Sequence, residues 1–111
     1  MDRWLEVRGK VQNVMFRQTV IRAMQKRGLE GGATNDSHDT SLVRMTLRGS
    51  IEQMEDLVRA LREDKAINDW GAKATSVEDV DAEHGMALET HQVTTANVDN
   101  RRWNPNITMF I

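Results

Sequence analysis

The stretch Gly9-Lys10-Val11-Gln12-Asn13-Val14-Met15-Phe16-Arg17 decides the fold, because a strand pattern ends within it and a helical pattern begins. Ahead of the turn, one face of a strand is formed by alternate residues, namely Leu5, Val7, Gly9 and Val11. Beyond the turn, apolar residues recur at helical spacing, namely Phe16, Val20, Ala23 and Met24. Gly28 suits the end of that helix, so the sequence predicts a strand, a turn and a helix in succession.

The predicted turn has the layout of an anion-binding site. Backbone N–H groups at the start of a helix lack partners, and the positive end of the helix dipole lies at the same point. Arg17 stands in the first helical turn, where its permanently charged guanidinium can hold two oxygens of a phosphoryl group. We therefore predict an anion-binding loop made of Gln12, Asn13, Val14, Met15, Phe16 and Arg17.

Two blocks of the sequence resemble the signature of the acylphosphatase family. Residues 9–17 read G-x-V-Q-x-V-x-F-R, which is similar to the family pattern G-x-V-Q-G-V-x-F/Y-R. The second block, Gly28-Leu29-Glu30-Gly31-Gly32-Ala33-Thr34-Asn35, resembles G-L-x-G-W-V-x-N and follows without a gap in spacing. The resemblance implies that the loop and Arg17 bind a phosphoryl group, and that Asn35 orients the water that attacks it.

Three features depart from the family pattern. Asn13 replaces a loop glycine; asparagine tolerates left-handed backbone geometry well, and it also suits the N-cap of the following helix. Gly32 stands where the family has a tryptophan, and Trp70 and Trp103 are the candidates to fill the space. The turn at residues 36–40 is longer than the family's, which would hold the attacking water more loosely.

The remaining pattern predicts a ferredoxin-like fold. Strands are expected at residues 31–35, 43–48 and 70–80. Ser50 and Gln53 form a capping box ahead of a helix whose apolar stripe is Ile51, Met54, Leu57, Val58 and Leu61. The resulting βαββαβ order describes an α+β two-layer sandwich, in which two helices cover one face of an antiparallel sheet.

The C-terminal part carries weaker signals. Residues 83–104 are polar and without a clean period, which predicts an extended loop or an irregular hairpin around residues 87–93. After the break at Pro105, residues 106–111 have the composition of a C-terminal strand. We expect residues 1–111 to form a single acylphosphatase-like domain.

Composition limits the classes of function. The chain has 111 residues, 39% of them hydrophobic and 29% charged, which suits one globular domain. The net charge of -2 and the absence of long charged runs predict no nucleic-acid partner. The chain has no cysteine, so it has no disulfide, thiolate zinc site or thiol nucleophile. No signal peptide or membrane-length apolar run is visible, so we expect a cytoplasmic protein without a membrane partner.

The histidines do not predict a metal site. The spacing of His38, His84 and His91 fits no recognised ligand set, so we expect no metal and no other cofactor. His38, just after Asn35, is the histidine expected nearest the anion site. Without the resemblance, Arg17 would be interpreted as a solvated side chain and Asn35 as a turn residue. They become catalytic candidates because both sequence blocks match the family pattern.

The resemblance implies a metal-independent acylphosphatase, a hydrolase that cleaves the carboxyl–phosphate bond of a small acyl phosphate to a carboxylate and inorganic phosphate. Because a carboxylate leaves readily, the reaction depends mainly on positioning and charge stabilisation. We expect the enzyme to be a monomer. The alternative, favoured by the three departures, is a catalytically weak acylphosphatase-like module that binds a phosphorylated ligand or partner.

A third interpretation is a ferredoxin-like domain that binds RNA or protein. RNA recognition on such a sheet normally uses exposed strand aromatics. The third predicted strand instead exposes Arg44, Thr46 and Arg48, so this interpretation ranks last.

Overall fold

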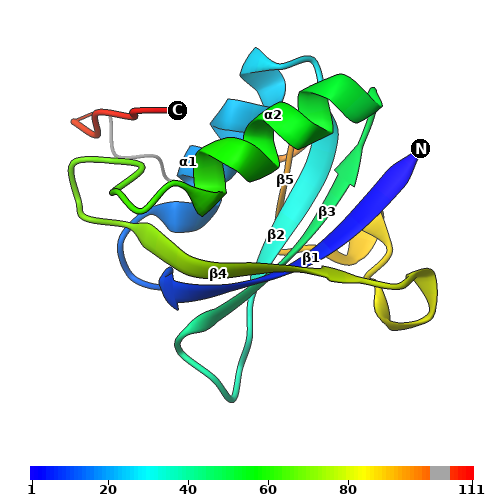
Figure 1. Ribbon diagram of the computed structural model, residues 1–111, viewed down its shortest axis with the longest axis horizontal. Coiled ribbons are helices and arrows are strands. Elements are labelled where there is room, and N and C mark those ends of the chain that lie inside the picture. Colours follow the sequence, from blue (N-terminus) through cyan, green and yellow to red (C-terminus); the bar gives the residue numbers. More distant parts are fainter. Residues whose placement is uncertain (101–105) are drawn as a thin grey trace.

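Two helices cover one face of a five-stranded antiparallel sheet in the computed structural model, which describes residues 1–100 and 106–111 (Figure 1). The strand order across the sheet is β4-β1-β3-β2-β5. The elements are β1 (Asp2–Lys10), α1 (Phe16–Lys26), β2 (Glu30–Asn35), β3 (Leu42–Arg48), α2 (Ile51–Arg62), β4 (Lys73–Val80) and β5 (Val93–Thr94). This confirms the predicted ferredoxin-like βαββαβ fold. Over the described residues, no helix combines the length and apolarity needed to cross a membrane.

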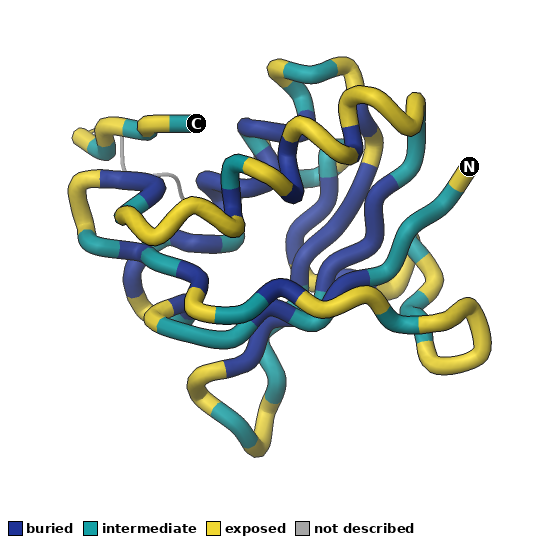
Figure 2. Tube along the Cα trace, in the orientation of Figure 1, coloured by how far each residue is buried: buried dark blue, intermediate teal, exposed yellow. Residues whose placement is uncertain are grey.

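The core lies between the helices and the sheet, where buried positions of β1, β2 and β3 face the two helices (Figure 2). The predicted stripe of α1 is buried, and so is that of α2 from Met54 onward. Ile51, which the stripe included, is 58% exposed at the first position of the helix, although its spacing from Met54 and Val58 places it on the same face. The cap is as predicted, since Ser50 Oγ accepts the N–H of Gln53 at 3.2 Å.

Residues 82–92 cross the face of the sheet opposite the helices. Trp4, Thr46 and Gly32 form one row across β1, β3 and β2. The backbone of Gly85 lies against the Trp4 ring, and the Thr46 hydroxyl donates to the carbonyl of Met86 at 2.8 Å. Thr46 is therefore fully buried, and the prediction that it is exposed is wrong, because this crossing segment covers it.

The side chain that fills the space beside Gly32 is His91. A Cβ on Gly32 would lie 2.5 Å from the Cβ of His91. Trp70 does not fill this space, because the nearest atoms to that Cβ all belong to His91 and Trp70 is itself 42% exposed. Trp103 lies outside the described residues.

The C-terminal strand of the fold is β5, at residues that the sequence assigned to a loop or irregular hairpin. It pairs with β2, and Val93 lies opposite Ala33. Residues 106–111, the predicted strand, instead make an isolated bridge between Met109 and Asn68. The position of the predicted strand is wrong because the buried pair Val93–Thr94 already occupies the edge of β2.

Gly32→Ala tests the packing of His91 on the sheet. The φ angle of Gly32 is not in the left-handed region, so alanine would cause no backbone strain there and would destabilise the protein only by its clash with His91. We expect a loss of about 1–3 kcal/mol in the free energy of unfolding. The loss should largely disappear in a His91→Gly background, where the clashing side chain is absent. Urea unfolding of the two single variants and the double variant measures it, and equal losses in both backgrounds would contradict this packing.

Candidate active site

The backbone of the loop between β1 and α1 is left-handed at alternate residues. Asn13 and Met15 adopt left-handed conformations, with φ of 64° and 59°, and Val14 between them does not. Such alternation turns successive N–H groups toward one concave side, which is a common anion-binding arrangement. Asn13 therefore has the left-handed geometry expected of a residue in the glycine position. It is not the N-cap, which is Met15 and has no side-chain cap.

A cavity of about 230 Å³ opens beside this loop. Its lining consists of Val11, Asn13, Met15, Phe16, Arg17 and Gln18. Four of the six predicted loop residues thus reach the cavity, and Gln12 and Val14 are the two that do not line it.

Gln12 ties the loop to the turn after β2. Its side-chain Nε2 donates to the carbonyls of Asp36, Asp39 and Leu42 at 3.1, 3.0 and 2.9 Å. The amide side chain of Gln12 therefore supports the site from the turn, which leaves its backbone as the group that can contribute to the loop.

The long turn after Asn35 is closely hydrogen-bonded. Asp36 Oδ2 accepts the N–H groups of His38 and Asp39 at 3.0 and 2.8 Å, and these bonds hold the pKa of Asp36 below its usual value. The hydroxyl and N–H of Ser41 likewise lower the pKa of Asp39. The expectation of a loose turn is therefore not supported. His38 is exposed on this turn.

Asn68, which the sequence analysis missed, holds the loop from behind. It is 1% exposed, and its Nδ2 donates to Val14 O and Thr19 Oγ1, both at 2.9 Å. Its Oδ1 accepts the N–H groups of Trp70 and Ala72. Because a trans peptide directs its carbonyl and the following N–H to opposite sides, an inward Val14 carbonyl turns the Met15 N–H away from Asn68.

Arg17 and Asn35 meet through a third residue, Gln92. The Oε1 of Gln92 accepts from Arg17 Nη1 at 2.8 Å and from the backbone N–H of Asn35 at 2.9 Å. The structure thus brings the two predicted catalytic residues to one acceptor. Gln92 belongs to the polar segment 83–104, where no motif or period marked it.

The side chain of Asn35 carries an unpaired acceptor. Its Oδ1 is buried, and it has no hydrogen-bond partner among the described residues. Such an atom costs about 1–3 kcal/mol when nothing donates to it, so it is usually found where a ligand or water supplies the donor. The Oδ1 of Asn35 is therefore an acceptor without a donor in this part of the structure.

The carboxylates and histidines of residues 1–100 and 106–111 form no metal-binding cluster, since no three His, Asp or Glu side chains there group closely enough to hold a metal ion. The groups of the site that suit an anion are the loop N–H groups and Arg17.

The comparison with protein families fits this geometry. The model of the acylphosphatase family matches residues 4–94. The chain belongs to the acylphosphatase family. Among solved structures, an acylphosphatase from Bacillus subtilis is 26% identical, with a TM-score of 0.59 over 82% of this chain and 92% of that one. An acylphosphatase from Coxiella burnetii is 24% identical, with a TM-score of 0.59 over 82% of this chain and 85% of that one. A comparison with curated protein sequences gave no significant match.

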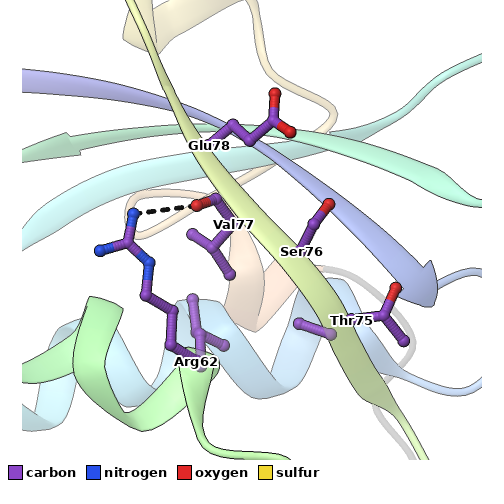
Figure 3. Close-up of a pocket in the computed structure, with 7 residues that line it drawn as sticks. Arg62, Thr75, Ser76, Val77 and Glu78 are labelled. Atoms are coloured by element: carbon purple, nitrogen blue, oxygen red, sulfur yellow. Dashed lines mark hydrogen bonds between the residues drawn. The ribbon is translucent and has the colours of Figure 1, made fainter.

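A second cavity, of about 280 Å³, lies between α2 and β4 and shares no lining residue with the first (Figure 3). Its arginine, Arg62, donates to the carbonyl of Val77 at 2.9 Å and lies 3.7 Å from a carboxylate oxygen of Asp79. Glu78 adds a negative charge to the lining. The arginine of this cavity is therefore already paired and a carboxylate lines it, so the cavity suits an anion less well than the β1–α1 loop does.

Asn68→Asp tests whether the loop depends on Asn68. A carboxylate cannot donate to Val14 O or to Thr19 Oγ1, whose own proton goes to Met15 O, so two buried acceptors would face a negative charge. We expect a loss of about 3 kcal/mol in the free energy of unfolding, together with weaker binding of inorganic phosphate. Urea unfolding and calorimetric titration measure the two effects. Gln53→Glu, the same chemical change at an exposed position in the first turn of α2, should leave phosphate binding unchanged and should not lower the free energy of unfolding, because a carboxylate is favourable there.

Proposed function

We propose that this protein is an enzyme that hydrolyses small acyl phosphates to a carboxylate and inorganic phosphate. The observation that carries the proposal is that Arg17 and the backbone N–H of Asn35 share one acceptor, Gln92, while the Oδ1 of Asn35 is buried and has no hydrogen-bond partner among the described residues. The attack of water on a phosphoryl group requires an acceptor that can hold the water and a cation that can hold the phosphoryl oxygens. Membership of the acylphosphatase family supports the same reaction.

The loop and Arg17 would bind the phosphoryl group. The N–H groups of residues 12–17 and the guanidinium would contact its oxygens, and these groups are already oriented before the substrate arrives. They would stabilise the charge that spreads over the phosphoryl oxygens in the transition state. In this proposal these fixed charges and dipoles replace a metal ion.

Asn35 would position the water. Its Oδ1 would accept a hydrogen bond from one O–H group of the water, and this bond would turn the water oxygen toward phosphorus. As the new P–O bond forms, the bond to the acyl oxygen breaks and its electron pair leaves with the carboxylate. Both water hydrogens remain with the products, as the dianionic substrate and water give a carboxylate and dihydrogen phosphate. A carboxylate needs little protonation to leave, so no general acid is assigned.

The alternative, a phosphate-binding module without turnover, loses part of its support. Asn13 adopts the left-handed geometry of a glycine, and the turn at residues 36–40 is fixed by hydrogen bonds. Both observations favour the enzyme over the module.

Arg17→Ala should remove nearly all hydrolysis of a small acyl phosphate such as benzoyl phosphate. The lost charge and forked contact correspond to roughly 3–5 kcal/mol of transition-state stabilisation, and Arg17→Lys should not restore it, because an ammonium cannot match two phosphoryl oxygens. Initial rates on folded protein measure the effect. Arg59→Ala, at a largely exposed position on α2, is the matched control. Retention of more than about a tenth of the wild-type rate in Arg17→Ala would refute the assignment.

Asn35→Ala should separate chemistry from binding. If Asn35 holds water, kcat should fall by about two to three orders of magnitude while the affinity for inorganic phosphate stays near that of the wild type. Steady-state kinetics and a phosphate titration measure the two quantities. A parallel fall in both would instead make Asn35 a phosphate ligand.

A further inference from the structure

Gln92 presents an uncharged oxygen to two donors of the site. Two groups near its side chain, Arg17 Nη1–H and the Asn35 N–H, can only donate, so the oxygen of the amide must face them. The oxygen lies 2.8 Å from the arginine nitrogen and 2.9 Å from the backbone nitrogen. One atom therefore links the guanidinium of Arg17 to the end of β2 that carries Asn35.

We propose that Gln92 is a positioning residue, which orients Arg17 and the Asn35 backbone for a phosphoryl ligand without adding a negative charge beside it. A carboxylate would make the same two hydrogen bonds, but it would repel the anion that Arg17 is placed to bind. This inference rests on the proposed function only in taking a phosphoryl group as the ligand.

The backbone of Gln92 is fixed at both ends. Its N–H donates to Thr34 Oγ1 at 2.9 Å, and its carbonyl accepts from Asn97 Nδ2 at 3.4 Å. Thr34 immediately precedes Asn35 on β2, so the main chain of Gln92 is tied to the strand whose end forms the site. A side chain that departs from a fixed backbone loses less freedom when it holds its partners.

His91 fixes the same segment through a fully paired network. The Thr46 hydroxyl donates to Met86 O, so it accepts from His91 Nε2–H at 2.6 Å. The other ring nitrogen, Nδ1, is then the acceptor of the Thr34 hydroxyl at 2.9 Å. Burial lowers the pKa of His91 to about 4, so the ring is neutral near pH 7, as this pattern of donors and acceptors requires.

The chain of contacts thus runs from the middle of the sheet to the site. His91 packs on Gly32 and bonds to Thr34 and Thr46, and the next residue along the chain, Gln92, reaches Arg17. The residue that replaces the family's tryptophan makes room for the imidazole, and the imidazole holds the backbone from which Gln92 extends.

Two substitutions at Gln92 test the proposal, with Gln53→Glu as the charge control at an exposed position. Gln92→Met keeps the length of the side chain and removes the acceptor. Gln92→Glu keeps the acceptor and adds the charge. For each protein, the backbone amide resonance of Asn35, the urea midpoint, the dissociation constant for inorganic phosphate and the kinetics of benzoyl phosphate hydrolysis are measured.

For Gln92→Met we expect the Asn35 amide resonance to move upfield, kcat to fall about tenfold or more, and phosphate to bind several-fold more weakly. For Gln92→Glu we expect a urea midpoint no lower than that of the wild type and an Asn35 amide that stays hydrogen-bonded, without the upfield movement, but a dissociation constant for phosphate at least about tenfold higher. Retained stability with lost affinity separates a positioning role from a merely structural one.

Other results would overturn the proposal. Tighter phosphate binding by Gln92→Met would show that Gln92 competes with the ligand. Unchanged affinity, rate and Asn35 resonance in Gln92→Met would show that it orients nothing, and wild-type affinity in Gln92→Glu would show that its neutrality does not matter. A further outcome is that the wild-type protein binds phosphate without hydrolysing benzoyl phosphate, while the Gln92 variants change phosphate affinity as expected. That result would refute the proposed function and leave the positioning role of Gln92 intact. A wild-type protein that binds no phosphate would refute both.

Discussion

The inward carbonyl of Val14 is the constraint on which the site depends. A helix start that keeps its N–H groups for a ligand cannot also satisfy them with its own cap, and Met15 indeed supplies none. The loop must then be held by something behind it. Asn68 does this from 54 residues further along the chain, and it uses all its hydrogen-bonding capacity in the process. The core therefore orients the loop before any ligand is bound.

A second constraint comes from the segment at residues 82–92, which covers the open face of the sheet and also reaches the site. A tryptophan at the position of Gly32 would occupy the space in which His91 lies. Without His91, the backbone of Gln92 would lose the network through Thr34 that fixes it. The glycine at position 32 is thus what allows the segment at residues 82–92 to pack on the sheet.

Local patterns predicted most of the fold, and long-range contacts account for what they missed. Neighbouring residues determine the strand and helix periods, the cap at Ser50 and the left-handed position of Asn13 in the loop. The sequence therefore displays these features directly. The short β5 has no period of its own, and it forms because the edge of β2 lies beside it. Arg17 and Asn35 were found through a resemblance of two blocks. Gln92 lies 75 residues from Arg17, and its importance depends on a contact that no local pattern encodes.

The amide partner of Arg17 differs from the partners of two other arginines of the chain, which are carboxylates. Arg48 is held by Asp2 and Arg27 by Asp56, each through a carboxylate at 2.8 Å, and the partner raises the stability of the pair by its charge. At the proposed phosphoryl site, a carboxylate beside Arg17 would offset the attraction of the guanidinium for an anion. An amide oxygen orients the guanidinium of Arg17 more weakly, because it has no net charge. The backbone to which the amide is attached adds to this orientation, because the hydrogen bonds of residues 91 and 92 to Thr34 make it rigid.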